Sequence, residues 1–132
     1  MTADQRKSVT SSLDAILKGE ILTRLSHNAS AENVDAMVVE ARKRFAANAL
    51  WTIGAIGVEY INHEARARLK VAFDEFRIAG GTLIVVVTDK PSIGTNFRVA
   101  AINAGNVPIK IAKTLKESNE LSAAHRAANN KT

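Results

Sequence analysis

The segment TLIVVVT, residues 82–88, constrains the fold more than any other part of this sequence. It has no alternation of apolar and polar residues and is rich in β-branched side chains, which is typical of a strand buried on both faces. Such a strand belongs inside a sheet with helices packed above and below it. The rest of the chain therefore has to supply those helices and the neighbouring strands.

Two further strands are predicted on either side of this segment. Residues 107–112, VPIKIA, indicate a slightly polar strand that suits a sheet edge, and residues 50–58 indicate a buried strand. Helical periodicity also runs through the second of these, so one long helix over about residues 31–79 is the alternative. Gly54 and Gly57 would each cost up to about 1 kcal/mol in a helix, and Trp, Thr, Ile and Val favour an extended chain, so we expect the strand.

Helices are predicted between the strands. The segment after Asn62, a suitable N-cap, has an apolar face and charged pairs at four-residue spacing on the other face, and Gly80 and Gly81 end it. A shorter helix is expected over residues 96–106. Ser30 can cap a further helix with a buried stripe of Val34, Met37, Val38, Ala41 and Phe45.

The N-terminal segment is also expected to be helical. Over residues 4–26 apolar side chains recur every four positions, at Val9, Leu13, Leu17, Ile21 and Leu25. Gly19 weakens the middle of this helix, so two short helices are the alternative. The chain then divides into a helical segment, residues 1–48, a βαβαβ unit, residues 50–112, and a polar basic tail, residues 113–132, with room for one last weak helix.

This order of elements predicts a single α/β domain over residues 1–132, with a small, Rossmann-like parallel sheet of about three strands joined by right-handed crossovers. A chain of 132 residues has the commonest size of one domain. A sheet of three strands leaves its edges unpaired, and such edges tend to be covered or to pair with another copy. We therefore expect a homo-oligomer.

Composition excludes several classes of protein. The chain has no cysteine, which rules out disulfides, thiolate zinc sites and cysteine nucleophiles. Its first residues lack the apolar run of a signal peptide, so a cytoplasmic protein is expected. The longest weakly polar stretch, residues 46–61, is shorter than the ~20 apolar residues that span a bilayer, and we expect no membrane association.

Positive charge is concentrated in the last third of the chain. Residues 1–89 contain eleven Lys or Arg and eleven Asp or Glu, whereas residues 90–132 contain seven Lys or Arg and two acids. Localised positive charge attracts phosphate-bearing or acidic partners, although a modest basic C-terminus is also common on ordinary solvated surfaces. The candidate nucleic-acid contacts in this part of the chain are Lys110, Lys113 and Lys116.

The loop after the central strand carries the candidate ligand site, because ligands gather at the carboxyl ends of parallel strands. We expect Gly94 to allow an unusual backbone turn and the amides of Thr95 to Arg98 to be free at a helix start, where they can hold a phosphate or carboxylate. An ordinary turn with Thr95 or Asn96 as the helix cap uses the same residue types. The candidate ligand-binding residues are Gly54, Gly57, Lys90, Ser92, Gly94, Thr95, Asn96 and Arg98.

The pattern indicates no catalytic residue, metal site or cofactor. The chain has no P-loop lysine motif, no G-x-G-x-x-G, no nucleophile elbow and no paired carboxylates. His27, His63 and His125 are isolated, and HEARA lacks the second histidine of a zinc helix. Glu59 and His63 could add a polar pocket beside the glycines, although His63 also suits an exposed first turn of a helix. We lean against an enzyme.

Two segments together resemble the Rossmann-like superfamily that includes DNA-processing protein A and the lysine-decarboxylase-like (LOG) proteins. GAIGVEYINHEARARLKVAFDEFRIAGGTLIVVV is similar to their glycine turn, helix, Gly-Gly and buried strand, and KPSIGTNFRVAAINAGNVPIKI to their later Pro, Gly-Thr, helix and strand. The spacing from Pro to Gly-Thr is one residue shorter than in the usual P-G-G-x-G-T. The resemblance implies binding of a nucleotide or single-stranded DNA, with Gly54, Gly57, Gly94 and Thr95 at the phosphates.

These observations support two hypotheses about function. The first is a non-enzymatic binding module for a phosphate-bearing ligand, nucleotide or nucleic acid, at the carboxyl edge of the small sheet. The alternative is a structural or adaptor subunit of a phage or conjugative assembly, which acts through protein–protein contacts.

Overall fold

The computed structural model describes residues 20–25 and 27–129. The elements are β1 (Glu20–Arg24), α2 (Ala31–Arg42), β2 (Leu50–Gly54), α3 (His63–Ile78), β3 (Leu83–Val87), α4 (Pro91–Asn103), β4 (Ile109–Ala112) and α5 (Leu115–Asn129). Most of the predicted N-terminal helix, residues 4–19, lies outside the described residues. None of the helices within the described ranges has the length and apolar character needed to cross a bilayer.

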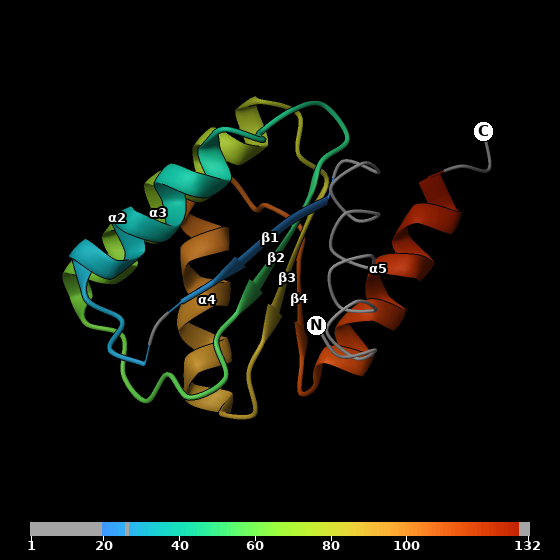
Figure 1. The fold of residues 1–132 in the computed structure, drawn as a ribbon. Coiled ribbons are helices and arrows are strands. Elements are labelled where there is room, and N and C mark those ends of the chain that lie inside the picture. Colours follow the sequence, from blue (N-terminus) through green and yellow to red (C-terminus); the bar gives the residue numbers. More distant parts are fainter. Residues whose placement is uncertain (1–19, 26, 130–132) are drawn as a thin grey trace, which may run out of the picture.

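The strands form a parallel four-stranded sheet in the order β1-β2-β3-β4. The strand predicted at residues 50–58 is confirmed over Leu50–Gly54, where Trp51 of β2 pairs with Ile84 of β3, and the chain turns after Gly54. Three consecutive crossovers of one hand place α2, α3 and α4 on the same face of the sheet, and α5 covers the other face (Figure 1). The α/β class and the parallel sheet are therefore as predicted.

The sheet has four strands and not about three, and the predicted N-terminal helix is wrong at residues 20–24. Residues 20–24 form β1, which pairs with β2 from Glu20 opposite Leu50 to Arg24 opposite Gly54. Ile21 and Leu25 extended the helical pattern of the preceding residues, so spacing alone favoured a helix. The open side of β2 decides the conformation, because its backbone groups need partners that an adjacent strand supplies.

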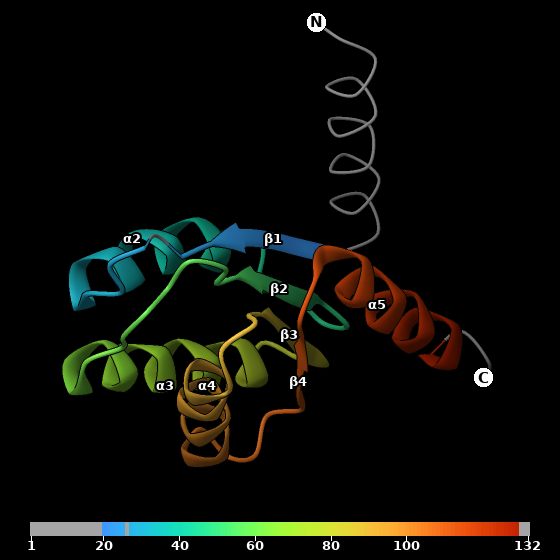
Figure 2. The same ribbon diagram turned by 90° about the horizontal axis from the view of Figure 1, so that it is seen from below.

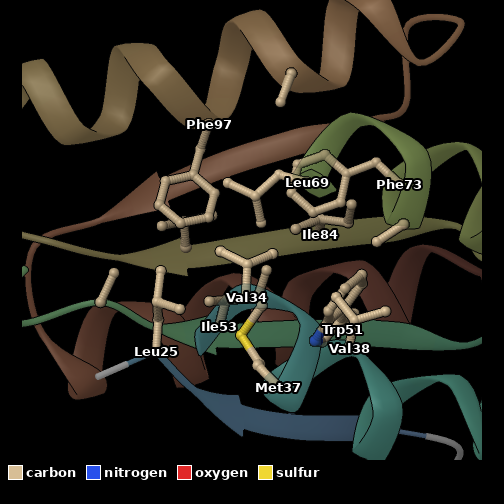
Figure 3. Packing of buried hydrophobic residues seen from close by; sticks show 14 of the residues in the cluster. Leu25, Val34, Met37, Val38, Trp51, Ile53, Leu69, Phe73, Ile84 and Phe97 are labelled. Carbon is tan, nitrogen blue, oxygen red and sulfur yellow. The ribbon is translucent and has the colours of Figure 1, made fainter. Parts of the chain in front are cut away.

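The larger part of the core lies between the sheet and α2, α3 and α4. The Trp51 ring is fully buried, with ring centroids 5.6 Å from Phe73 and 5.7 Å from Phe76. Its Nε1 donates a hydrogen bond to Thr23 Oγ1 of β1 at 2.8 Å, which satisfies the buried indole N–H. Figure 3 shows the same layer continuing through Val34, Ile53, Leu69, Ile84 and Phe97.

The predicted caps hold α2 and α3. The Ser30 side chain accepts a hydrogen bond from the amide of Asn33 at 3.2 Å, and the Asn62 side chain accepts one from the amide of Ala65 at 2.7 Å. A bidentate pair joins the helices, with Arg42 donating to Glu75 at 2.7 and 3.0 Å, and this hydrogen bond is the main cause that raises the pKa of Arg42.

The weak helix predicted in the polar tail is α5, and it covers part of the second face of the sheet. Ser118 and Ser122 are buried, and Leu121 contacts a small apolar cluster on β2, β3 and β4. Arg126 also forms an ion pair with the buried Glu20 of β1. Small and polar residues face the sheet, which explains why no apolar stripe indicated this helix. The apolar cluster consists of Leu50, Leu83, Val85 and Ala112.

A hydrogen-bonded chain also fixes α5 to the sheet. His125 Nε2 lies 3.0 Å from Thr82 Oγ1, and that hydroxyl donates to the carbonyl of Ala49 at 3.2 Å. Because the hydroxyl has a single proton, the imidazole is the donor to Thr82. Burial, and secondly the positive charge of Lys110, lower the pKa of His125. The packed state of α5 therefore favours the neutral imidazole.

Candidate functional site

The carboxyl ends of β2, β3 and β4 form a common rim, as expected for a parallel sheet. An ion pair joins the loops after β2 and β3, with Lys90 Nζ 3.4 Å from Glu59 Oε1. Both loops begin directly where their strands end, at Gly54 and Val87. The rim depends on the extended chain at Trp51, because a continuous helix there would have removed the first of these loops.

A hollow of about 300 Å³ lies on this rim, beyond the ends of β3 and β4. Its charged lining residues are Lys90, Arg98, Lys113, Asp89 and Glu117. The remaining lining residues are Thr88, Pro91, Gly94, Thr95 and Ile111. Two adjacent loops and the first turns of two helices thus contribute to one depression.

The hollow lies where two neighbouring strands send their helices to opposite faces of the sheet. The chain leaves β3 into α4, on the face of α2 and α3, and leaves β4 into α5, on the other face (Figures 1 and 2). Such divergence opens a crevice outside the carboxyl ends of the strands, the usual ligand position in open α/β sheets. The positive ends of the two helix dipoles meet there.

The hollow is lined by more cations than acids, and one of the acids is held by hydrogen bonds to the backbone. Three cations, Lys90, Arg98 and Lys113, face two acids. The carboxylate of Glu117 is bound to the backbone, because its Oε2 accepts a hydrogen bond from the amide of Lys113 at 3.0 Å. Its own amide donates to Thr114 Oγ1 at 3.1 Å, which caps α5. Glu117 therefore holds the loop in shape, and the lining carries one more positive than negative side chain.

The start of α4 differs from the prediction. The helix begins at Pro91, so the amides of Thr95 to Arg98 lie inside it and are not free at its start. Gly94 is helical and needs no unusual turn. A Cβ on Gly94 would lie 3.3 Å from Ile111 Cγ2 of β4, so this glycine allows close packing of helix and strand.

The other polar residues of the loop make local contacts. Thr95 Oγ1 donates to the carbonyl of Pro91 at 3.0 Å, and Asn96 Nδ2 donates to the carbonyl of Ser92 at 2.9 Å. Asn96 Oδ1 also accepts a hydrogen bond from Arg66 of α3 at 3.3 Å. Neither Thr95 nor Asn96 caps the helix, because its cap position is Lys90, which makes no side-chain capping bond.

The structure brings together only part of the predicted site. Lys90, Gly94, Thr95 and Arg98 line the hollow together with Lys113, which was predicted as a nucleic-acid contact that extends the basic surface. The predicted residues outside its lining are Gly54, Gly57, Ser92, Asn96, Lys110 and Lys116.

The two glycines after β2 lie in a different part of the rim. Gly54 ends β2, and Gly57 has a φ of +93° in the following turn, where a Cβ would lie 3.7 Å from His27 Nδ1. His63 is exposed in the first turn of α3, and its Nδ1 is 3.3 Å from Arg66 Nη2. The suggested pocket of Glu59 and His63 is therefore replaced by two separate contacts, the second being the Glu59 pair with Lys90.

Glu117 lines the hollow and was missed by sequence reasoning. The spacing T-x-x-E at Thr114 to Glu117 is that of a capping box and would have indicated the start of α5. Thr88, buried at the end of β3, was also missed; its Oγ1 accepts a hydrogen bond from the amide of Lys90 at 3.2 Å. No sequence signal indicated that the loops of β3 and β4 would share one hollow.

Within residues 20–25 and 27–129, no group of three or more His, Asp or Glu side chains is placed to hold a metal ion. No family model matches the chain, and comparisons with curated proteins and with solved structures find no similar protein. The assignment of a function therefore depends on the geometry and charge of the site.

Proposed function

We propose that this protein binds a phosphate-bearing ligand, a nucleotide or a nucleic-acid backbone, in the hollow between the loops after β3 and β4. One observation carries the proposal: three cations and the starts of α4 and α5 surround a crevice at the carboxyl ends of two strands whose helices diverge. Both helix dipoles and side-chain charges attract an anion to this point. No step of bond making or breaking is part of the proposal.

The three cations have different roles in the proposed site. Arg98 lies two turns into α4 and offers a planar guanidinium that can hold two phosphate oxygens. Lys90 and Lys113 lie just before α4 and α5 and act as mobile point charges at the rim. Thr95 is exposed at the same edge, and its hydroxyl oxygen keeps lone pairs free while its proton goes to Pro91.

The size of the hollow limits the ligand. A volume of about 300 Å³ is at the lower end of the range for small-molecule pockets, roughly 300–1,000 Å³. It accommodates a phosphate with an attached sugar or part of a base, and it is too small to enclose a dinucleotide cofactor. A terminal phosphate group or one segment of a nucleic-acid backbone fits this limit.

Glu59 competes with the proposed ligand. Its carboxylate is 72% exposed and pairs with Lys90 at 3.4 Å, so the pair is accessible and weak. An arriving phosphate would replace Glu59 as the partner of Lys90. Removing the charge of Glu59 should therefore strengthen binding.

The test is calorimetric titration with inorganic pyrophosphate, ATP and a single-stranded oligonucleotide. We expect Arg98→Ala and Lys113→Ala each to weaken binding by about 10- to 150-fold, in line with the loss of one charge-assisted contact of about 1.5–3 kcal/mol. Lys116→Ala is the matched control, since Lys116 lies in the first turn of α5 but outside the lining of the hollow. Salt should weaken oligonucleotide binding more steeply than pyrophosphate binding, because more phosphates are neutralised.

The outcomes separate the proposed site from a general basic surface. Equal losses for Lys113→Ala and Lys116→Ala would show that charge density, and not the hollow, attracts the ligand. Absence of binding to all three probes at low salt would refute the proposal. Binding of the oligonucleotide alone would identify nucleic acid as the ligand, and binding of ATP or pyrophosphate alone would identify a nucleotide.

A further inference from the structure

The edge of β1 is open, and it lies on the opposite side of the sheet from the proposed ligand site at β3 and β4. β1 is the outermost strand of the described sheet (Figure 2). Leu22 in its middle is 46% exposed, although it is a large apolar side chain. An exposed strand edge with an apolar centre is a template for pairing with another strand.

The direction of the backbone groups along β1 shows which residues are available. The amide of Leu25 donates to the carbonyl of Gly54 at 2.8 Å, so its backbone faces β2. Successive residues of a strand direct their backbone groups to opposite edges, so Ile21 and Thr23 also face β2. The backbone groups of Glu20, Leu22 and Arg24 therefore point to the open edge.

The sequence of β1, EILTR, is complementary to itself in the antiparallel direction. A two-fold axis midway between the two Leu22 residues would place Leu22 opposite Leu22 of the second copy. It would also place Glu20 of each copy opposite Arg24 of the other. Each of these opposed residues directs its backbone outward, so each pair can exchange two hydrogen bonds. A charged residue such as Arg24 ordinarily discourages edge pairing. Here each Arg24 faces Glu20 of the other copy, so two pairs of opposite charge form, one on each side of the axis.

The side chain of Glu20 can pair with two arginines, one from its own chain and one from the second copy. It is buried and paired with Arg126 of α5 in its own chain. A carboxylate has two oxygens and accepts from more than one guanidinium, so Arg24 of the second copy can join the same group. The two charges would lie on one face of the joined sheet, because a two-fold axis perpendicular to a sheet preserves its faces.

The edge of β1 borders a hollow. A hollow of about 470 Å³ lies between β1 and α2. Its lining combines Leu22, Thr23 and Arg24 of β1 with Asn33, Ala36, Met37 and Glu40 of α2. Ala36 is a small residue that lets another chain approach, and the polar groups at Asn33 and Glu40 border the apolar floor.

We propose that β1 pairs antiparallel with β1 of a second copy of this chain, to form a continuous eight-stranded sheet with its two-fold axis at Leu22. The complementary EILTR register, the outward backbone of three residues and the hollow beside the strand are the observations that carry it. The pairing leaves the proposed ligand sites free at the two distant ends of the joined sheet. It does not depend on the proposed function, and the two can fail separately.

The first test is sedimentation equilibrium over a range of protein concentrations, with Leu22→Pro as the variant. Proline removes the outward amide of Leu22 but no hydrogen bond to β2, and edge strands tolerate such a residue. We expect a monomer–dimer equilibrium for the wild type and a monomer for Leu22→Pro and for Arg24→Glu. A wild type that stays monomeric at every concentration, or a dimer that survives Leu22→Pro, would overturn the proposal.

The second test does not depend on the folding of the proline variant. The chain has no cysteine, so Leu22→Cys introduces a single thiol at the proposed axis. Val39→Cys in α2 is the matched control, since the two side chains are 46% and 49% exposed and Val39 lies outside the hollow. A short bifunctional maleimide should join Leu22→Cys into dimers in high yield and leave Val39→Cys largely monomeric. Equal yields for the two variants would overturn the proposal.

Discussion

Gly81→Ala should destabilise the fold by about 1–2 kcal/mol, although alanine usually suits a chain better than glycine. A Cβ on Gly81 would lie 2.3 Å from Phe76 Cζ and 2.4 and 2.5 Å from its Cε atoms. Carbon atoms in contact prefer separations of about 3.5–4.0 Å, so the ring would have to move by about 1 Å or more. The Phe76 ring is fully buried and packed against two other aromatic rings.

The neighbours of Phe76 set the magnitude. Its ring centroid lies 5.5 Å from Phe45 and 5.7 Å from Trp51, so a shift of the ring disturbs an aromatic cluster. Overpacking of this kind costs about 1–3 kcal/mol, and the reduced freedom of the unfolded chain offsets about 0.4–1 kcal/mol. For a chain of this length, the net loss corresponds to a fall in Tm of roughly 3–10 °C.

Thermal and urea unfolding of four proteins would test the reasoning: wild type, Gly81→Ala, Phe76→Leu and the double variant. Phe76→Leu alone should also destabilise, because it opens a cavity. In the double variant the smaller side chain leaves room for the new Cβ, so the combined loss should be smaller than the sum by about 1 kcal/mol. Losses that add within about 0.5 kcal/mol would refute the proposed clash.

Three further predictions follow from single contacts. Thr23→Val leaves the buried Trp51 Nε1 without its acceptor and should cost about 1–3 kcal/mol in urea unfolding, whereas Thr23→Ser should keep most of the stability. Because folding lowers the pKa of His125, its contribution to stability is fully present above pH 6.5, the ordinary pKa, and is lost as the pH falls below that value. Between pH 8 and pH 5, the Tm of His125→Gln should therefore fall less than the Tm of the wild type. Glu59→Gln should strengthen pyrophosphate binding by about 2- to 5-fold by freeing Lys90, and an unchanged affinity would exclude this competition.

The proposed ligand site and the proposed dimer interface lie on different parts of the molecule. The hollow lies at β3 and β4, and the pairing edge is β1, on the other side of the sheet. Variants at Arg98 should change ligand affinity without changing the native mass, and variants at Leu22 should do the reverse. Coupled effects would indicate that ligand binding and association involve one surface.

The candidate site could be predicted only where local chemistry was sufficient. Polar and glycine residues after a buried strand indicated the loop at Lys90, and four of its residues do line the hollow. The start of α4 was placed four or more residues too late, because Pro91 was taken as part of the turn, although proline is favoured at the first position of a helix. Lys113 and Glu117 joined the site through the fold, since residues far apart in sequence meet only when β3 and β4 pair.

The sequence by itself determined the elements whose side chains carry a strong local pattern. An unbroken β-branched run produced β3, and capped amphipathic segments produced α2 and α3, because side-chain spacing and helix capping are set by residues close together along the chain. Only the tertiary structure decided that residues 20–24 are a strand and that the polar tail is a helix against the sheet. Local spacing favoured a helix at Ile21 and Leu25, and the tail helix has no apolar stripe, so their final placement follows from the unpaired edge of β2 and the uncovered face of β3 and β4.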